Sequence, residues 1–171
     1  MSLTRTIATL AFSAALAISV LPARSQDQSS AEDPSAVAVK QIVSNYAERV
    51  NRHDAHDVVS LFALAADFTD PSGVTIHGRN AIQDYFTSQF AGTLKAASRT
   101  STVYDVRLLS PEIAAVDGVW ELVATREANG SMNPLRQGRF DYVLTKQGGR
   151  WFITIFHECN LPNLPAESSA K

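Results

Sequence analysis

The sequence predicts an α+β domain in which helices cover one face of an antiparallel sheet. Apolar residues recur at helical spacing in the first half of the chain, between residues 36 and 91. From residue 100 onwards the apolar spacing is two, which is typical of strands. Helices that precede a run of antiparallel strands pack on one face of the sheet. Three helices on a curved sheet leave one end open, so we expect a cone-shaped domain with a ligand pocket.

Three helices are expected before the change of spacing. The first starts at Ala36, with Ser35 as its N-cap, and a second, short helix follows Asp54 as its N-cap. The third follows Asn80 and runs to about Ala91. The apolar side chains expected to face inward from the first two helices are Val39, Ile42, Val43, Tyr46, Ala47, Val50, Val58, Leu61, Phe62 and Ala65.

The stretch FTDPSGVTIHGRNAI, residues 68–82, is expected to form a hairpin that leads into the third helix. Pro71 presets φ and Gly73 tolerates a positive φ, so residues 71–73 read as a turn between two short strands. Asp70 then lies at the corner of the hairpin, beneath a helix that can cover it. An exposed Asp there is an ordinary turn residue; a covered one is a candidate catalytic group.

Four longer strands are expected in the second half of the chain. A bulge is expected near Asp117 and Gly118, and an exposed hairpin loop over residues 127–137. The expected strands are residues 102–109, 113–125, 138–146 and 151–160.

The N-terminal 25 residues read as a secretory signal peptide. Arg5 precedes an apolar run that is followed by the small residues Ala23 and Ser25 at the −3 and −1 positions of a cleavage site. Cleavage implies a periplasmic or secreted protein; a retained membrane anchor is the alternative. We therefore expect a signal peptide over 1–25, a flexible tether over 26–35, one domain over 36–162 and a loose tail over 163–171.

Composition and motifs argue against several kinds of partner. Without residues 1–25 the chain has 13 basic and 17 acidic residues, and it lacks a basic patch for nucleic acid. Cys159 is the only cysteine, which excludes an intrachain disulfide. His53 and His56 have no third ligand of matching context, so no metal is expected. No phosphate-binding loop, serine nucleophile elbow or dinucleotide fingerprint occurs, and no cofactor is expected.

The hairpin motif and the closing segment GGRWFITIFHE resemble the nuclear-transport-factor-2-like superfamily, also called SnoaL-like or cystatin-like. Within it the chain resembles the small secreted proteins of the SgcJ/EcaC type (DUF4440) and, at site level, the ketosteroid isomerases. The resemblance covers residues 39–160 and implies a cone-shaped NTF2-like fold. It implies less about activity, because this fold carries many functions.

The resemblance to ketosteroid isomerases implies three catalytic residues. Their general-base Asp lies in a motif similar to residues 70–73, which implies Asp70 as the base. Tyr46, 24 residues earlier, matches their oxyanion-hole tyrosine, and Asp141, eight residues before Gly149, matches their protonated second donor. The chemistry that this resemblance implies is proton abstraction next to a carbonyl group, with the enolate oxygen held by a tyrosine and a neutral carboxyl group.

Several placements stay open at the level of sequence. Asp141 is either a buried neutral donor or an ionised partner of Arg139, two residues away on the same strand face. On the last strand, the resemblance to the isomerases implies that the face with Phe152, Thr154, Phe156 and Glu158 lines the pocket, whereas a bulge would bring His157 in instead. The residues expected to contact the substrate are Arg139, Phe62, Phe86, Phe156, Glu158 and His157.

Three functions are compatible with these residues. The first is a small-molecule isomerase or lyase that uses acid–base groups, and the second is a binding protein for an apolar or carboxylated ligand with Arg139 as its anchor. The third is an assembly module. A homodimer through the sheet is expected because Phe140, Tyr142 and Leu144 are expected to form an apolar face that needs covering.

Overall fold

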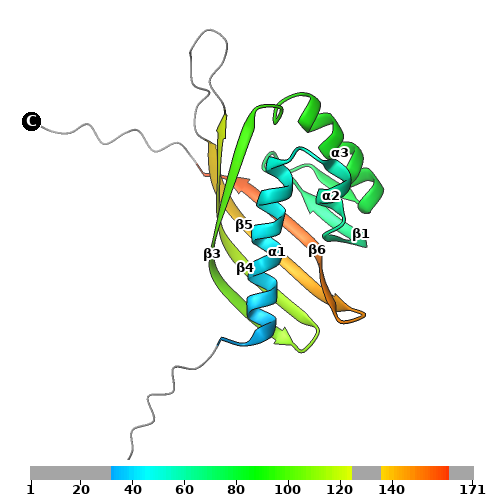
Figure 1. Cartoon of the computed structure of the whole chain (residues 1–171), viewed down its shortest axis with the longest axis vertical. Helices are drawn as coiled ribbons and strands as arrows, with labels where there is room; N and C mark the ends of the chain where they lie inside the picture. Colours follow the sequence, from blue (N-terminus) through cyan, green and yellow to red (C-terminus); the bar gives the residue numbers. More distant parts are fainter. Residues whose placement is uncertain (1–31, 125–135, 162–171) are drawn as a thin grey trace, which may run out of the picture. The chain divides into compact units, whose positions relative to one another are not determined.

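The computed structural model describes residues 32–124 and 136–161 (Figure 1). The predicted signal peptide, most of the tether, nearly all of the loop over 127–137 and the predicted tail lie outside these residues. The helices of the described part are α1 (Pro34–Asn51), α2 (Ala55–Val59) and α3 (Arg79–Ala91). Its strands are β1 (Phe62–Thr69), β2 (Thr75–His77), β3 (Ala97–Ser110), β4 (Ile113–Ala124), β5 (Arg136–Gln147) and β6 (Arg150–Asn160).

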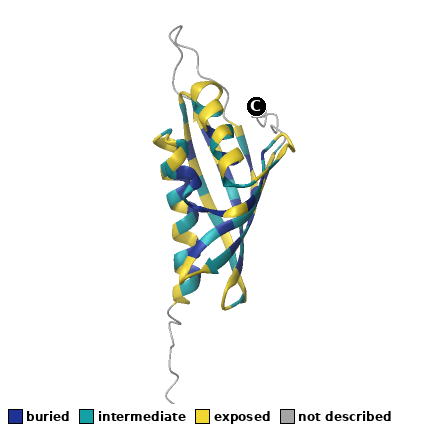
Figure 2. Ribbon diagram, turned by 90° about the vertical axis from the view of Figure 1, so that its right-hand side faces the viewer, coloured by how far each residue is buried: buried dark blue, intermediate teal, exposed yellow. Residues whose placement is uncertain are grey.

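The strands form one curved sheet with the order β2-β1-β6-β5-β4-β3. All neighbouring strands are antiparallel except β1 and β6, which are parallel. The helices lie on one face of this sheet (Figure 1), and the buried residues lie between the two layers (Figure 2). The predicted α+β class, with three helices on a mostly antiparallel sheet, is confirmed.

Helix α1 begins two residues earlier than expected. Asp33 is its N-cap, because its carboxylate accepts a hydrogen bond of 2.7 Å from the backbone N–H of Ser35. Pro34 occupies the first turn, where its missing N–H and fixed φ suit a helix start. The expected apolar stripe is buried, except that Ile42 is half-buried. The helix thus presents Tyr46 to the interior.

The second helix ends earlier than expected. Asp54 caps it as predicted, accepting a hydrogen bond of 3.0 Å from Asp57 N–H. The chain leaves the helix at Val59, and Phe62 opens strand β1 instead. Ala65, expected to face inward from a helix, is exposed on that strand.

Helix α3 is not capped by Asn80. Its N-cap is Gly78, which has a φ of 83° and makes no side-chain capping bond. The N–H of Gly78 instead donates to the carbonyl of Ala66 on β1 at 2.8 Å. The start of α3 is therefore fixed against the sheet, next to the predicted hairpin. That hairpin pairs β1 with β2, and Gly73 takes the positive φ of the turn, 89°.

Two of the register irregularities in the sheet lie on strands that line the site. The first lies in β3 at Tyr104, opposite Asp117 and Gly118, where the predicted bulge was placed on the other strand. The second lies in β6 at Thr154, opposite the step from Val143 to Leu144. Because a bulge reverses which side chains face inward, Trp151 and Ile153 face the core before it, and Phe156 and Glu158 after it.

The sheet face that was expected to be covered by a second protomer is the face that packs against the helices. Phe140, Tyr142 and Leu144 are each at most 1% exposed beneath the helices. The argument for a sheet dimer from these residues was therefore wrong, and the homodimer itself stays a prediction. Among the described residues, no helix has the length and apolar character needed to cross a membrane.

Gly138 allows the sheet to pack against Trp120. The two residues are register partners, and a Cβ at Gly138 would overlap the Trp120 ring and the carbonyl oxygen of Cys159. We expect Gly138→Ala to lower the free energy of unfolding by about 2 to 3 kcal/mol through overpacking, measured by thermal melting. Gly92→Ala is the control, because its nearest neighbour would be 3.4 Å away. Equal melting temperatures for the two variants would contradict this explanation.

Candidate functional site

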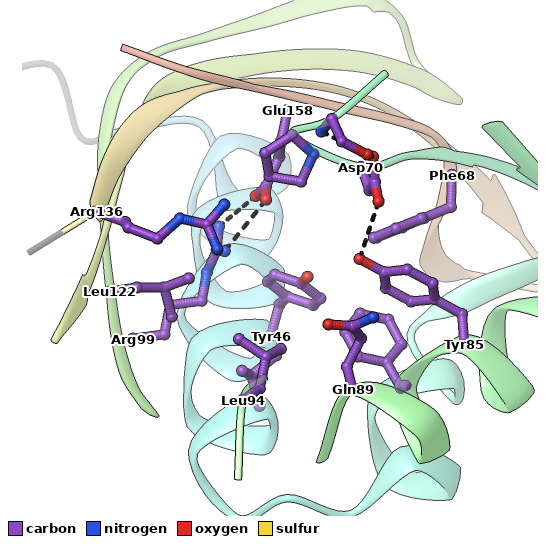
Figure 3. A pocket seen from close by; sticks show the side chains of 14 residues that line it. Tyr46, Phe68, Asp70, Tyr85, Gln89, Leu94, Arg99, Leu122, Arg136 and Glu158 are labelled. Carbon is purple, nitrogen blue, oxygen red and sulfur yellow. Dashed lines mark hydrogen bonds and ion pairs between the residues drawn. The ribbon is translucent and has the colours of Figure 1, made fainter. Parts of the chain in front are cut away.

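A cavity of about 200 Å³ opens between the helices and the concave face of the sheet. Helix α1, helix α3, the turn after β1 and the ends of β3, β4, β5 and β6 each contribute side chains (Figure 3). The lining residues are Tyr46, Val50, Phe68, Asp70, Pro71, Ser72, Tyr85, Phe86, Gln89, Leu94, Arg99, Leu122, Arg136 and Glu158.

The two oxygens of the Asp70 carboxylate have different surroundings. Oδ1 accepts three hydrogen bonds from its own turn: Ser72 N–H at 2.8 Å, Ser72 Oγ at 2.6 Å and Val74 N–H at 3.1 Å. Oδ2 accepts one long bond of 3.3 Å from the hydroxyl of Tyr85, on α3. The turn therefore fixes the carboxylate through one oxygen. The other oxygen faces the cavity and the hydroxyl of Tyr85 (Figure 3).

Asp70 is ionised at neutral pH. Burial by itself raises the pKa of this carboxyl, because it disfavours the charged form. The hydrogen bonds from Ser72, Val74 and Tyr85 outweigh burial, so the pKa of Asp70 lies below its ordinary value. Asp70 is consequently a hydrogen-bond acceptor under physiological conditions, with the capacity to take a proton from a bound molecule.

Tyr46 stands at the centre of the cavity wall, between Asp70 and Glu158 (Figure 3). Its ring contacts Phe156 edge-on, with the two ring centroids 5.1 Å apart. The guanidinium carbon of Arg99 lies 4.9 Å from the centroid of the Tyr46 ring. Burial raises the pKa of its hydroxyl well above the ordinary value. Within the described part of the chain this hydroxyl makes no hydrogen bond, so it lines the cavity as a neutral donor.

A buried ion pair forms the opposite side of the cavity. Arg99 and Glu158 are 5% and 8% exposed and share two hydrogen bonds, one of them Nη1 to Oε2 at 3.2 Å and the other Nη2 to Oε1. Tyr142 donates its hydroxyl to Glu158 Oε1 at 2.8 Å. Asn51, at the end of α1, exchanges hydrogen bonds of 2.6 and 2.9 Å with the backbone of Arg99. The pair is thereby held by both layers of the domain.

Arg99 remains charged at physiological pH. Burial alone lowers the pKa of Arg99, but the neighbouring Glu158 carboxylate more than offsets this, so the pKa of Arg99 is raised. Burial also raises the pKa of Tyr142 well above the ordinary value, which keeps its hydroxyl as a donor. The Glu158 carboxylate is therefore held by fixed donors from Arg99 and Tyr142.

Four of the predicted site residues line the cavity: Tyr46, Asp70, Phe86 and Glu158. Phe62 and Phe156 do not reach it. They are fully buried behind Tyr46, where they support its ring. Phe156 and Glu158 both face inward, as one of the two alternatives for the last strand predicted.

Three predicted site residues lie on the other face of the sheet, and these placements were wrong. Asp141, Arg139 and His157 are exposed, because their strand neighbours, such as Tyr142, take the inward positions. Arg139 lies 3.6 Å from the carboxylate of Asp117 on β4, rather than next to Asp141. The neutral carboxyl donor that the isomerase resemblance implied at Asp141 is therefore not part of this cavity.

Arg99, Tyr85 and Arg136 contribute to the cavity without having been predicted. Arg99 was missed because the strand was expected to begin at residue 102. Continuing the two-residue spacing back to Ala97 would have placed Arg99 inward, with Ser101 and Val103. Tyr85 shares the helical stripe of α3 with Phe86, but nothing in the sequence indicates that it reaches Asp70.

The arrangement suits hydrogen bonding and proton transfer. The cavity offers a neutral donor at Tyr46 and a charged acceptor at Asp70, against aromatic walls. Within residues 32–124 and 136–161, no group of three His, Cys, Asp or Glu side chains is placed to hold a metal ion.

A double-mutant cycle measures the buried ion pair. We expect Arg99→Met and Glu158→Gln each to lower the free energy of unfolding by about 3 kcal/mol, because each leaves a buried charge unpaired. The double variant should lose less than the sum, in urea denaturation. Arg107→Gln, on the same strand but exposed, should change stability by less than about 0.5 kcal/mol. If the losses of unfolding free energy in Arg99→Met and Glu158→Gln add up to that of the double variant, the two residues do not stabilise the protein as an ion pair.

The lowered pKa of Asp70 predicts a pH dependence. Since the folded pKa lies below the unfolded one, the contribution of Asp70 to stability is present above about pH 4 and is lost as pH falls through the folded value. Thermal melting between about pH 2 and 7 should therefore show a steeper acid-side loss for the native protein than for Asp70→Asn. Asp84→Asn, at an exposed position of α3, should keep the native profile. Identical slopes for Asp70→Asn and the native protein would refute this.

The fold has solved relatives of low sequence identity. A domain of unknown function with a cystatin-like fold from Nostoc punctiforme PCC 73102 superposes with a TM-score of 0.68 at 20% identity, covering 77% of this chain and 81% of that chain. A ketosteroid isomerase-like protein from Erwinia carotovora atroseptica SCRI1043 superposes with a TM-score of 0.65 at 16% identity, covering 76% of this chain and 98% of that chain. An NTF-2-like protein of unknown function from Shewanella oneidensis MR-1 superposes with a TM-score of 0.62 at 18% identity, covering 73% of this chain and 98% of that chain.

These similarities confirm the predicted NTF2-like, or cystatin-like, fold. A comparison with curated proteins gives no match. The sequence model of the SnoaL-like domain matches residues 33–157, which include every strand and helix that supplies the cavity except the last residues of β6. The chain therefore belongs to the SnoaL-like domain family.

Proposed function

We propose that this domain binds a small organic molecule in its cavity, with Asp70 and Tyr46 in direct contact with the ligand. The asymmetry of the Asp70 carboxylate carries the proposal. A turn that serves only itself needs Oδ1, whereas Oδ2 is held apart and faces the cavity with a single long bond. Membership of the SnoaL-like family supports a small-molecule site in this position.

The walls define the ligand as largely apolar. Phe68, Phe86, Leu94 and Leu122 surround the polar centre. Aromatic and aliphatic walls with a few oriented polar groups are typical of sites for small organic molecules. A ring that carries a hydroxyl or carbonyl oxygen matches both features, because the oxygen can meet Tyr46 while the ring packs on the walls.

Acid–base catalysis on a carbonyl compound is the second candidate. Asp70 is ionised, and Tyr46 shares its cavity as a donor for a developing enolate oxygen. The difference from the isomerase pattern is the missing neutral carboxyl group: Asp141 is on the other face and Glu158 is bound to Arg99. Binding is therefore the function that the geometry supports best. Asp70→Asn separates the two candidates: in an enzyme it should abolish turnover while the substrate still binds, and in a binding protein it should change the affinity modestly.

Three further features of the predicted function stay predictions. Export depends on residues 1–25, which lie outside the described residues. The homodimer and the SgcJ/EcaC branch likewise stay predictions.

Ligand titration tests the binding site. We expect a panel of small phenols and cyclic ketones to change the fluorescence of Trp120, whose ring lies 5.5 Å from the Arg99 guanidinium in the cavity wall. Tyr46→Phe should weaken binding of the best compound about fivefold, because it removes one hydrogen bond. Tyr104→Phe is the matched control, since Tyr104 is 60% exposed on the outer face.

Two results would overturn the proposal. One is the absence of saturable binding across the panel at millimolar concentration. The other is saturable binding that Tyr46→Phe and Asp70→Asn leave unchanged.

A further inference from the structure

Arg136 is a cation at the edge of the cavity. It is the first residue of β5 and the register partner of Leu122 on β4, and both side chains line the cavity (Figure 3). In contrast to Arg99, which is buried, Arg136 is exposed and so lies where the cavity meets solvent.

A neutral amide, that of Asn160, orients the Arg136 guanidinium. Its Nη2 donates to Asn160 Oδ1 at 3.1 Å, and Asn160 Nδ2 in turn donates to the carbonyl of Pro71 at 3.0 Å. Asn160 thus joins Arg136 to the turn that holds Asp70. An amide partner directs the guanidinium without neutralising its charge.

The other cation of the cavity, Arg99, already has an anionic partner, whereas Asp70 keeps one oxygen towards the cavity. Glu158 is paired with Arg99, and Asp70 is held by the hydrogen bonds of its own turn. Arg136 forms no ion pair with any carboxylate in residues 32–124 or 136–161. The mouth of the cavity therefore presents an oriented positive charge, above a deep end with the Tyr46 donor and the Asp70 acceptor.

We infer that Arg136 recognises a carboxylate on the ligand, so that the ligand class is a small cyclic acid with a hydroxyl or carbonyl oxygen at its other end. A guanidinium binds a carboxylate through two parallel hydrogen bonds, which fixes the orientation of the ring as well as its charge. A single negative charge suits the site, because the ionised Asp70 in the same cavity disfavours more highly charged groups. The anchor predicted at Arg139 is thus replaced by Arg136, three residues earlier. This inference rests on the proposed binding function.

The test compares 4-hydroxybenzoate with its methyl ester, which keeps the ring and hydroxyl and removes the charge. Isothermal titration calorimetry on the native protein should show the acid binding about tenfold more tightly than the ester at low salt. The preference should shrink as ionic strength rises, because Arg136 is exposed. Arg136→Gln should abolish the preference by weakening the acid alone, and Arg136→Lys should retain part of it.

Arg139→Gln is the matched control. It removes the same charge from the same strand, on the opposite face, and should keep the native preference. A thermal melt of each variant confirms that it is folded.

The outcomes separate this inference from the proposed function. If the ester binds as well as the acid, or if Arg136→Gln keeps the preference, the inference is overturned while the binding site stands. If Arg139→Gln and Arg136→Gln lose the preference equally, long-range charge and not contact explains it, and the inference is again overturned. If neither compound binds and the wider panel of phenols and ketones also fails, both fall.

Discussion

The ion pair between Arg99 and Glu158 spans the concave face of the sheet. Arg99 lies on β3 and Glu158 on β6, with β4 and β5 between them. In a flat sheet, three strand spacings would separate their backbones by about 14 Å. The pair therefore depends on a strongly curved sheet, and the bulge at Tyr104 and the ring of Phe140 packed over Gly118 allow that curvature. The pair is also hydrogen-bonded to Tyr142 and to Asn51 of α1. The curvature of the sheet, the packing of α1 and the shape of the cavity therefore depend on the same pair.

The ion pair between Arg99 and Glu158 also determines the electrostatics of the cavity. Two carboxylates face one small space, a combination that would raise the pKa of at least one of them if both were unpaired. Arg99 neutralises Glu158 locally, and the turn of residues 70–73 supplies donors to Asp70. Asp70 can therefore remain ionised next to the Tyr46 hydroxyl. The polar centre is thus a donor and an acceptor with fixed positions, rather than a shared-proton pair of acids.

The same geometry distinguishes this site from the isomerase arrangement that the sequence resembles. Asp70 and Tyr46 share the cavity as the spacing implied, but the inward carboxyl group comes from β6 rather than β5. It is also paired with Arg99, whereas the isomerase role needs a neutral acid that donates to the ligand. A shared family and fold with a different third residue is expected where one scaffold carries many activities. The chemistry must therefore be argued from Asp70, Tyr46 and their neighbours.

The sequence alone determined the class of fold, the 68–82 hairpin and the inward stripe of α1, because helical and strand periodicities and turn residues are local properties. The resemblance to ketosteroid isomerases also implied that Asp70, Tyr46 and Phe86 face the cavity, with Glu158 as one of two alternatives on the last strand. Only the tertiary structure decided that Asp141, Arg139 and His157 face outward and that Arg99, Tyr85 and Arg136 reach the cavity. The alternation along β5 separates Phe140, Tyr142 and Leu144 from Arg139 and Asp141, but only the packing of the helices decides which of these two faces is inward. On β6 the bulge at Thr154 also changes the inward face. The partner of a buried charge can lie 59 residues away, as Glu158 does from Arg99, and no local pattern links them.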